Sequence, residues 1–142
     1  MSRSAAFLAL ALLACGGESP GSPALAWPDC APWDGAATRI VIPQEAGSDS
    51  ASQTNLTLVI YQAPEKIRGG EWTISDQSGT ELSVLLCPAA GPCVSATAGW
   101  VRVDSGAPAS AIEGQYRVTL SDGRVLAGRY AAPLQPRVAM CG

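Results

Sequence analysis

The stretch QYRVTLSDGRVLAGRY, residues 115–130, specifies a β-hairpin and thereby the fold class of the chain. Its first half alternates polar residues with three large apolar ones: Tyr116, Val118 and Leu120. This alternation has the period of two residues that a half-buried strand requires. Asp122 and Gly123 follow, a pair that tolerates the positive φ angles of a tight turn. The segment therefore predicts two antiparallel strands joined by a short loop.

The loop length decides the register of this hairpin. A two-residue turn would place the large apolar side chains of the two strands on different faces of the hairpin. A three-residue loop with Gly123 in a bulge instead opposes Val118 to Leu126. It also lays the ring of Tyr116 over Gly128. We predict the three-residue loop, because it gathers both apolar sets on one face of the hairpin.

Elsewhere after Cys30, short β-branched or apolar runs alternate with turn-forming residues. Together with the hairpin they give the following strand candidates: 38–42, 55–61, 71–75, 81–86, 94–103, 115–120 and 125–130. Outside the N-terminal segment, no window has the apolar period of an amphipathic helix. The sequence thus predicts a mainly β fold of about seven short strands. We expect a small antiparallel sandwich or a partly open barrel, after an N-terminal signal helix.

The N-terminus carries the pattern of an export signal. Arg3 gives a short positive start, and residues 5–14 form an uncharged apolar run. As a helix these residues reach only about 15 Å, half of the roughly 30 Å of hydrocarbon in a bilayer. The run is therefore typical of a secretory signal peptide rather than of a transmembrane span.

The apolar run ends in Leu12-Leu13-Ala14-Cys15-Gly16, which resembles the lipobox of bacterial lipoproteins. The resemblance implies removal of residues 1–14 and lipidation of Cys15, which becomes the first residue of an exported protein anchored in the cell envelope. An ordinary signal peptide cleaved near Ala14 is the alternative. Several acyl chains anchor a protein stably, whereas one gives only marginal binding. Gly16 in place of an aspartate after Cys15 implies, by the same resemblance, sorting to the outer membrane.

The rest of the chain divides into a tether and one domain. Residues 15–28 begin with the lipobox cysteine and continue as a Gly-, Ser- and Pro-containing stretch typical of a flexible tether. Residues 29–142 are long enough for a single domain. That domain resembles the small, disulfide-bearing, β-rich envelope lipoproteins of Gram-negative bacteria.

The four cysteines beyond Cys15 predict two disulfides in an exported chain. Cys87 and Cys93 flank a short Pro- and Gly-containing loop, so we pair them with each other. Cys30 opens the domain and Cys141 nearly closes it, so their bridge would join its two ends. A four-cysteine metal site or a redox pair is the alternative, but those sites favour closer cysteine spacing.

An aromatic and acidic cluster surrounds Cys30. Trp27, Asp29, Trp33 and Asp34 lie within a few residues of it and form a candidate ligand-binding set. Indole rings stack on the apolar faces of sugars, and carboxylates accept hydrogen bonds from sugar hydroxyls. In the alternative interpretation, the indoles cover the end of the core beside the disulfide. Trp72 and Trp100 lie within strand candidates, where packing is the simpler expectation.

Composition excludes several functions. The 142 residues include no histidine and have a formal net charge of −3. Imidazole-based catalysis and imidazole metal sites are therefore excluded, and we expect neither a metal nor a cofactor. An acidic chain lacks the positive surface that nucleic acids require. No serine lies in a nucleophile elbow, and no glycine loop has the pattern of a phosphate site.

These observations together predict a non-catalytic, lipid-anchored envelope protein with a binding or structural role. The first hypothesis is a module that binds another envelope protein, inhibition of a secreted hydrolase being one form of that role. The second is a module that binds cell-wall glycan through Trp27 or Trp33. The third is a carboxylate-dependent hydrolase, which needs a cleft holding two acids.

Overall fold

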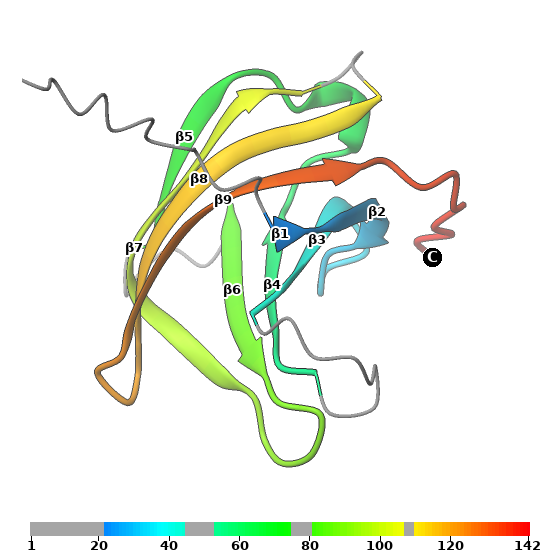
Figure 1. The fold of residues 1–142 in the computed structure, drawn as a ribbon. Coiled ribbons are helices and arrows are strands. Elements are labelled where there is room, and N and C mark those ends of the chain that lie inside the picture. Colours follow the sequence, from blue (N-terminus) through cyan, green and yellow to red (C-terminus); the bar gives the residue numbers. More distant parts are fainter. Residues whose placement is uncertain (1–21, 45–52, 75–80, 107–109) are drawn as a thin grey trace, which may run out of the picture.

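The computed structural model describes residues 22–44, 53–74, 81–106 and 110–142 (Figure 1). The predicted signal peptide of residues 1–14, the lipobox Cys15 and residues 16–21 of the predicted tether lie outside these ranges. The described chain is mainly β, as the sequence predicts. Its strands are β1 (Ser22–Pro23), β2 (Leu25–Cys30), β3 (Ala36–Pro43), β4 (Asn55–Ile60), β5 (Gly70–Ile74), β6 (Leu82–Cys87), β7 (Val94–Ser105), β8 (Ala111–Leu120) and β9 (Val125–Pro133). A single 3-10 turn, η2 (Pro64–Lys66), lies between β4 and β5 among the described residues.

The strands form one curled sheet, a partly open barrel. Hydrogen bonding follows the order β1-β9-β8-β7-β6-β4-β3-β2, and β5 pairs with β7 off this path. All pairings between two named strands are antiparallel except that of β1 with β9. The long strand β7 pairs with β6 only at Ser95 and Val94, and further along with β5, so it joins the two halves of the sheet (Figure 1). A parallel bridge between Ala26 of β2 and Leu134, just after β9, brings the ends of this order together.

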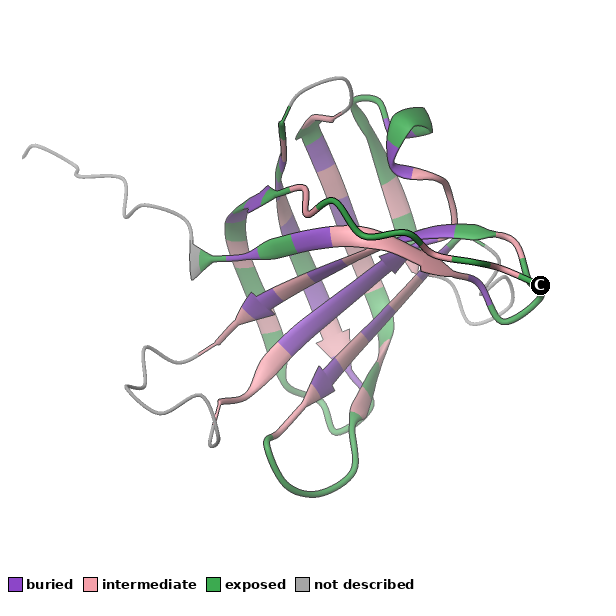
Figure 2. Ribbon diagram, turned by 90° about the vertical axis from the view of Figure 1, so that its right-hand side faces the viewer, coloured by how far each residue is buried: buried purple, intermediate pink, exposed green. Residues whose placement is uncertain are grey.

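One apolar core fills the inside of the curled sheet. Buried and more exposed residues alternate along several strands (Figure 2), most regularly in β6 and β8. The largest fully buried side chains come from both halves of the sheet: Ile40, Ile42, Leu56, Leu58, Ile60, Ile67, Val101, Val103, Ile112, Val118 and Leu120. Each such side chain contributes about 1.5–3 kcal/mol relative to its exposed state. The buried hydroxyl of Thr38 donates a hydrogen bond of 2.8 Å to the carbonyl oxygen of Gln62.

The hairpin of β8 and β9 has the predicted register. Val118 opposes Leu126, and Tyr116 opposes Gly128. The N–H of Leu120 donates to the carbonyl oxygen of Arg124 at 2.8 Å, which leaves a three-residue loop. Gly123 in that loop has a φ of +87°, the conformation of a bulge glycine. The three-residue loop is therefore confirmed, and it places both apolar sets toward the core.

The segment before Cys30 differs from its expected form. Residues 22–28 were expected in the flexible tether, but the structure places them in β1, β2 and the residue between these strands. Ala24 and Ala26 are buried in the core, so small side chains fill the space beside β3 and β9. Two prolines, and alanines at the buried positions, make this strand hard to recognise in the sequence. The folded domain thus includes residues from 22 onward, where the sequence predicted a boundary at 29.

Candidate functional site

Both predicted disulfides are present. Cys30 and Cys141 are bonded, with their Cα atoms 5.5 Å apart, and so are Cys87 and Cys93, at 4.2 Å. The second bridge closes the loop between β6 and β7. The first joins the end of β2 to the last residues of the chain. Disulfides of this kind are typical of proteins outside the cytoplasm.

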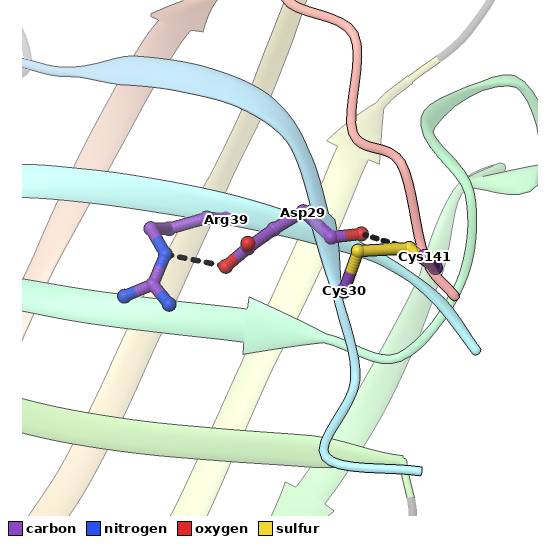
Figure 3. A network of polar contacts seen from close by, with 4 residues as sticks. All are labelled: Asp29, Cys30, Arg39 and Cys141. Atoms are coloured by element: carbon purple, nitrogen blue, oxygen red, sulfur yellow. Dashed lines mark hydrogen bonds and ion pairs between the residues drawn. A yellow bond between two sulfur atoms is a disulfide. The ribbon is translucent and has the colours of Figure 1, made fainter. Parts of the chain in front are cut away.

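Residues 134–142, which we call the C-terminal strap, come after β9 in the chain and lie alongside β2 in space. At one end, the N–H of Gln135 donates to the carbonyl oxygen of Ala26 at 2.7 Å. At the other end, Cys141 is bonded to Cys30, and its Sγ atom lies 3.8 Å from the carbonyl oxygen of Asp29 (Figure 3). Between these two points the strap passes along the edge of β2 that β3 does not occupy. It therefore covers an edge strand that would otherwise present unpaired backbone groups.

Trp27 and Asp29 lie on the outer face of β2, each with a cationic partner. Arg39 of β3 donates from Nε to the carboxylate of Asp29 at 2.6 Å (Figure 3). The guanidinium carbon of Arg137, from the strap, lies 4.3 Å from the centre of the Trp27 ring. Cation–π contacts of this kind contribute about 0.5–1 kcal/mol at exposed sites. One face of the Trp27 indole is thus covered by Arg137 of the strap.

Trp33 and Asp34 lie in the tight turn between β2 and β3. The N–H of Ala31 donates to the carbonyl oxygen of Gly35 at 2.7 Å, and Asp34 has a φ of +62°. The ring of Trp33 lies 4.7 Å from that of Tyr61 and is tilted by 56°, yet 53% of the residue is exposed. Trp33 thus packs on Tyr61 while Trp27 packs under Arg137. Three of the four predicted residues thus have separate partners (Arg137, Arg39 and Tyr61), and the two indoles do not form a pair.

Exposed apolar side chains concentrate along β2. Within the described ranges, five large hydrophobic residues are exposed: Leu25 (46%), Trp33 (53%), Val125 (52%), Val138 (89%) and Met140 (90%). All but Val125 belong to β2, to the turn after it or to the strap bonded to it. We call these four the β2 surface. Of these four residues, the sequence pattern indicated only Trp33 as a candidate site residue. For the strap residues the one signal in the sequence is the predicted bond of Cys141 to Cys30.

A separate hollow of about 260 Å³ lies on the other half of the sheet. It is lined by Asp104, Glu113, Gly114, Arg129, Tyr130 and Ala131. Asp104 accepts hydrogen bonds from Arg102 at 2.9 Å and from Gln115 at 3.3 Å. Burial, together with the nearby charge of Asp104, raises the pKa of Tyr130 well above its ordinary value, so this phenol stays neutral. Two carboxylates, Asp104 and Glu113, thus line one hollow, but that of Asp104 is already paired with Arg102.

The two remaining tryptophans differ in position. Trp72 of β5 packs against the main core, as expected. Trp100 of β7 was also expected to pack, but it pairs with Arg117 on the outer face of the sheet and lies 6.0 Å from the guanidinium of Arg102. The reason is its register, because the neighbours Gly99 and Val101 face Val118 and Tyr116 inside the barrel.

The part of the chain that the structure describes contains neither a membrane-spanning helix nor a cluster of metal-binding side chains. There, no helix has the length and apolar character needed to cross a membrane. Nor do three or more Cys, Asp or Glu side chains gather there in a way that would hold a metal ion. Comparison with protein-family models, with curated proteins and with solved structures finds no match to this chain.

Proposed function

We propose that this chain is a non-catalytic, lipid-anchored protein of the bacterial envelope that binds another envelope protein through the β2 surface. The observation that carries the proposal is the concentration of exposed apolar side chains along β2. Burying such side chains is favourable by about 25 cal/mol per Å². Apolar patches on an otherwise polar surface are therefore typical of protein–protein contacts.

The lipid anchor is the second part of the proposal, and it rests on the lipobox-like segment around Cys15. Both disulfides are compatible with export. Because the folded part includes Ser22, the distance from Cys15 to the domain is at most about 24 Å of extended chain. The proposed anchor thus holds the β2 surface close to the membrane and restricts the partner to proteins of the same envelope.

The anchor is tested by the substitution Cys15→Ser in the full chain. We expect the variant to lose incorporation of radiolabelled palmitate, because the lipid is attached through this thiol. The domain should then be recovered in the soluble fraction. Labelling that equals that of the unmodified chain would refute the lipobox assignment.

The binding role is tested by affinity capture with the oxidised chain from Gly16 onward, which keeps β1 and β2 intact. Detergent-solubilised envelope proteins and insoluble cell wall are offered in parallel. We expect one envelope protein to be retained in near-equal amount, and we expect Leu25→Asp to weaken that retention at least tenfold. The control is Val125→Asp, an equally exposed residue in the β8–β9 hairpin, which should leave retention unchanged.

Glycan binding is the second candidate, and the exposure of Trp33 beside Tyr61 favours it. An exposed indole with a neighbouring phenol offers a stacking surface to a sugar ring. In the same experiment, retention on cell wall that Trp33→Ala abolishes would support this function instead. Trp27→Ala is its matched control, because Arg137 already covers that ring.

A further inference from the structure

The C-terminal strap presents two apolar side chains in a regular alternation. Val138 and Met140 are 89% and 90% exposed, whereas Ala139 and Cys141 are partly covered. A period of two residues is the pattern of an extended chain with one face against the domain and the other in solvent. Neither outward side chain belongs to the core or to the partly buried residues packed against it. Neither side chain therefore adds to the packing of the core.

The segment between residues 137 and 141 is held in place from both sides. Gln135 is hydrogen-bonded to Ala26, Arg137 stacks on Trp27, and Cys141 is bonded to Cys30. Between these fixed points, no hydrogen bond within the described parts of the chain uses the backbone groups of Val138, Ala139 or Met140. The strap thus offers unpaired N–H and C=O groups along a path that is already fixed. A segment held in this way loses less conformational entropy when it binds than a free tail would.

We propose that residues 137–141 are the recognition segment of this protein, and that a partner protein binds them as an added strand. The partner is one with an open sheet edge or an extended-peptide groove, lined by two apolar pockets that accept Val138 and Met140. Strand addition uses backbone hydrogen bonds for affinity and pockets for alternate side chains for specificity, and the strap supplies both. This inference rests on the proposed binding function, and it specifies which part of the β2 surface the partner contacts.

The charge on the strap favours a partner groove with an acidic group beside its two apolar pockets. Arg137 is engaged by the Trp27 ring, and Arg39 is paired with Asp29. The segment therefore presents two apolar side chains, unpaired backbone groups and the exposed, positively charged guanidinium of Arg137. A second copy of the chain is the competing occupant, since two straps could pair with each other.

The experiment uses the oxidised chain from Gly16 onward with a photo-reactive phenylalanine analogue at position 138, 140 or 125. Each is mixed with detergent-solubilised envelope proteins and irradiated. We expect positions 138 and 140 to crosslink to one protein species and position 125 to give none. Unlabelled chain should compete for this crosslink, whereas the double variant Val138→Asp/Met140→Asp should compete at least tenfold more weakly. Both residues point into solvent, so the double variant should unfold at the same urea concentration as the parent.

The outcomes separate this inference from the function on which it rests. Equal crosslinking at 125, or undiminished competition by the double variant, overturns the strap as the recognition segment and leaves the binding function standing. Crosslinking of one chain to another, with a matching dimer by light scattering, overturns the partner-groove assignment. If the unmodified chain captures no envelope protein in the affinity experiment, the proposed function itself fails.

Discussion

Replacing Gly99 by alanine is expected to lower the free energy of unfolding by about 3–5 kcal/mol, which is enough to unfold much of the protein. Gly99 lies in β7 with a backbone φ of +120°, a conformation that residues other than glycine rarely adopt. A Cβ there would also overlap the carbonyl oxygen of Arg117 and the Cα of Val118 in β8. Backbone atoms in the middle of a paired strand cannot move aside without breaking the ladder. Urea denaturation followed by tryptophan fluorescence measures the loss.

Gly123→Ala is the matched control for this prediction. Gly123 also has a positive φ, +87°, but no atom lies within 4 Å of the position that its Cβ would take. Alanine there meets only the backbone penalty of the left-handed region, about 1–2 kcal/mol. The difference between the two variants therefore measures the overlap with β8. Equal losses would show that β7 does not approach β8 as closely as the structure has it.

Removing the Cys30–Cys141 bridge by changing both cysteines to serine is expected to lower the free energy of unfolding by about 4–5 kcal/mol. The bridge spans 111 residues, so its loss restores a large amount of conformational freedom to the unfolded chain. In the folded chain it also frees one end of the strap, so Arg137 is no longer held over Trp27. We therefore expect a lower urea midpoint together with greater acrylamide quenching of tryptophan fluorescence.

The Cys87–Cys93 bridge supplies the comparison. It spans only six residues and closes the loop between β6 and β7, far along the chain from the strap. Its removal should cost about 2–3 kcal/mol and should leave the quenching of Trp27 unchanged. If the two double variants lose the same stability, the loop-entropy account of the longer bridge is wrong.

Local pattern was sufficient for most of the strands. In the hairpin of β8 and β9, the alternation of Tyr116, Val118 and Leu120 and the position of Gly123 predicted the register that the structure has. All seven strand candidates overlap strands of the sheet, and among their described residues only Tyr61 and Glu81 lie just outside a strand. Such agreement is expected where one face of a strand is buried, because a slip of one residue would turn every apolar side chain toward solvent.

Local pattern failed where burial depends on small side chains. Ala24 and Ala26 are buried, but alanine carries little hydrophobic signal, and the prolines around them are typical of a tether. What makes residues 22–28 part of the fold is the space left between β3 and β9 when the sheet curls. The size of that space is set by the other strands, so it cannot be predicted from the residues of this segment alone.

The sequence by itself determined the mainly β class, the hairpin register and, through cysteine number and spacing, the pairing of both disulfides. Only the tertiary structure decided which residues the β2 surface contains. Val138 and Met140 are ordinary apolar residues in the sequence. They become a candidate recognition segment because the bond of Cys141 to Cys30 holds them along β2 with their side chains in solvent. Exposure depends on what the rest of the chain covers, and that is a property of the whole fold rather than of any segment.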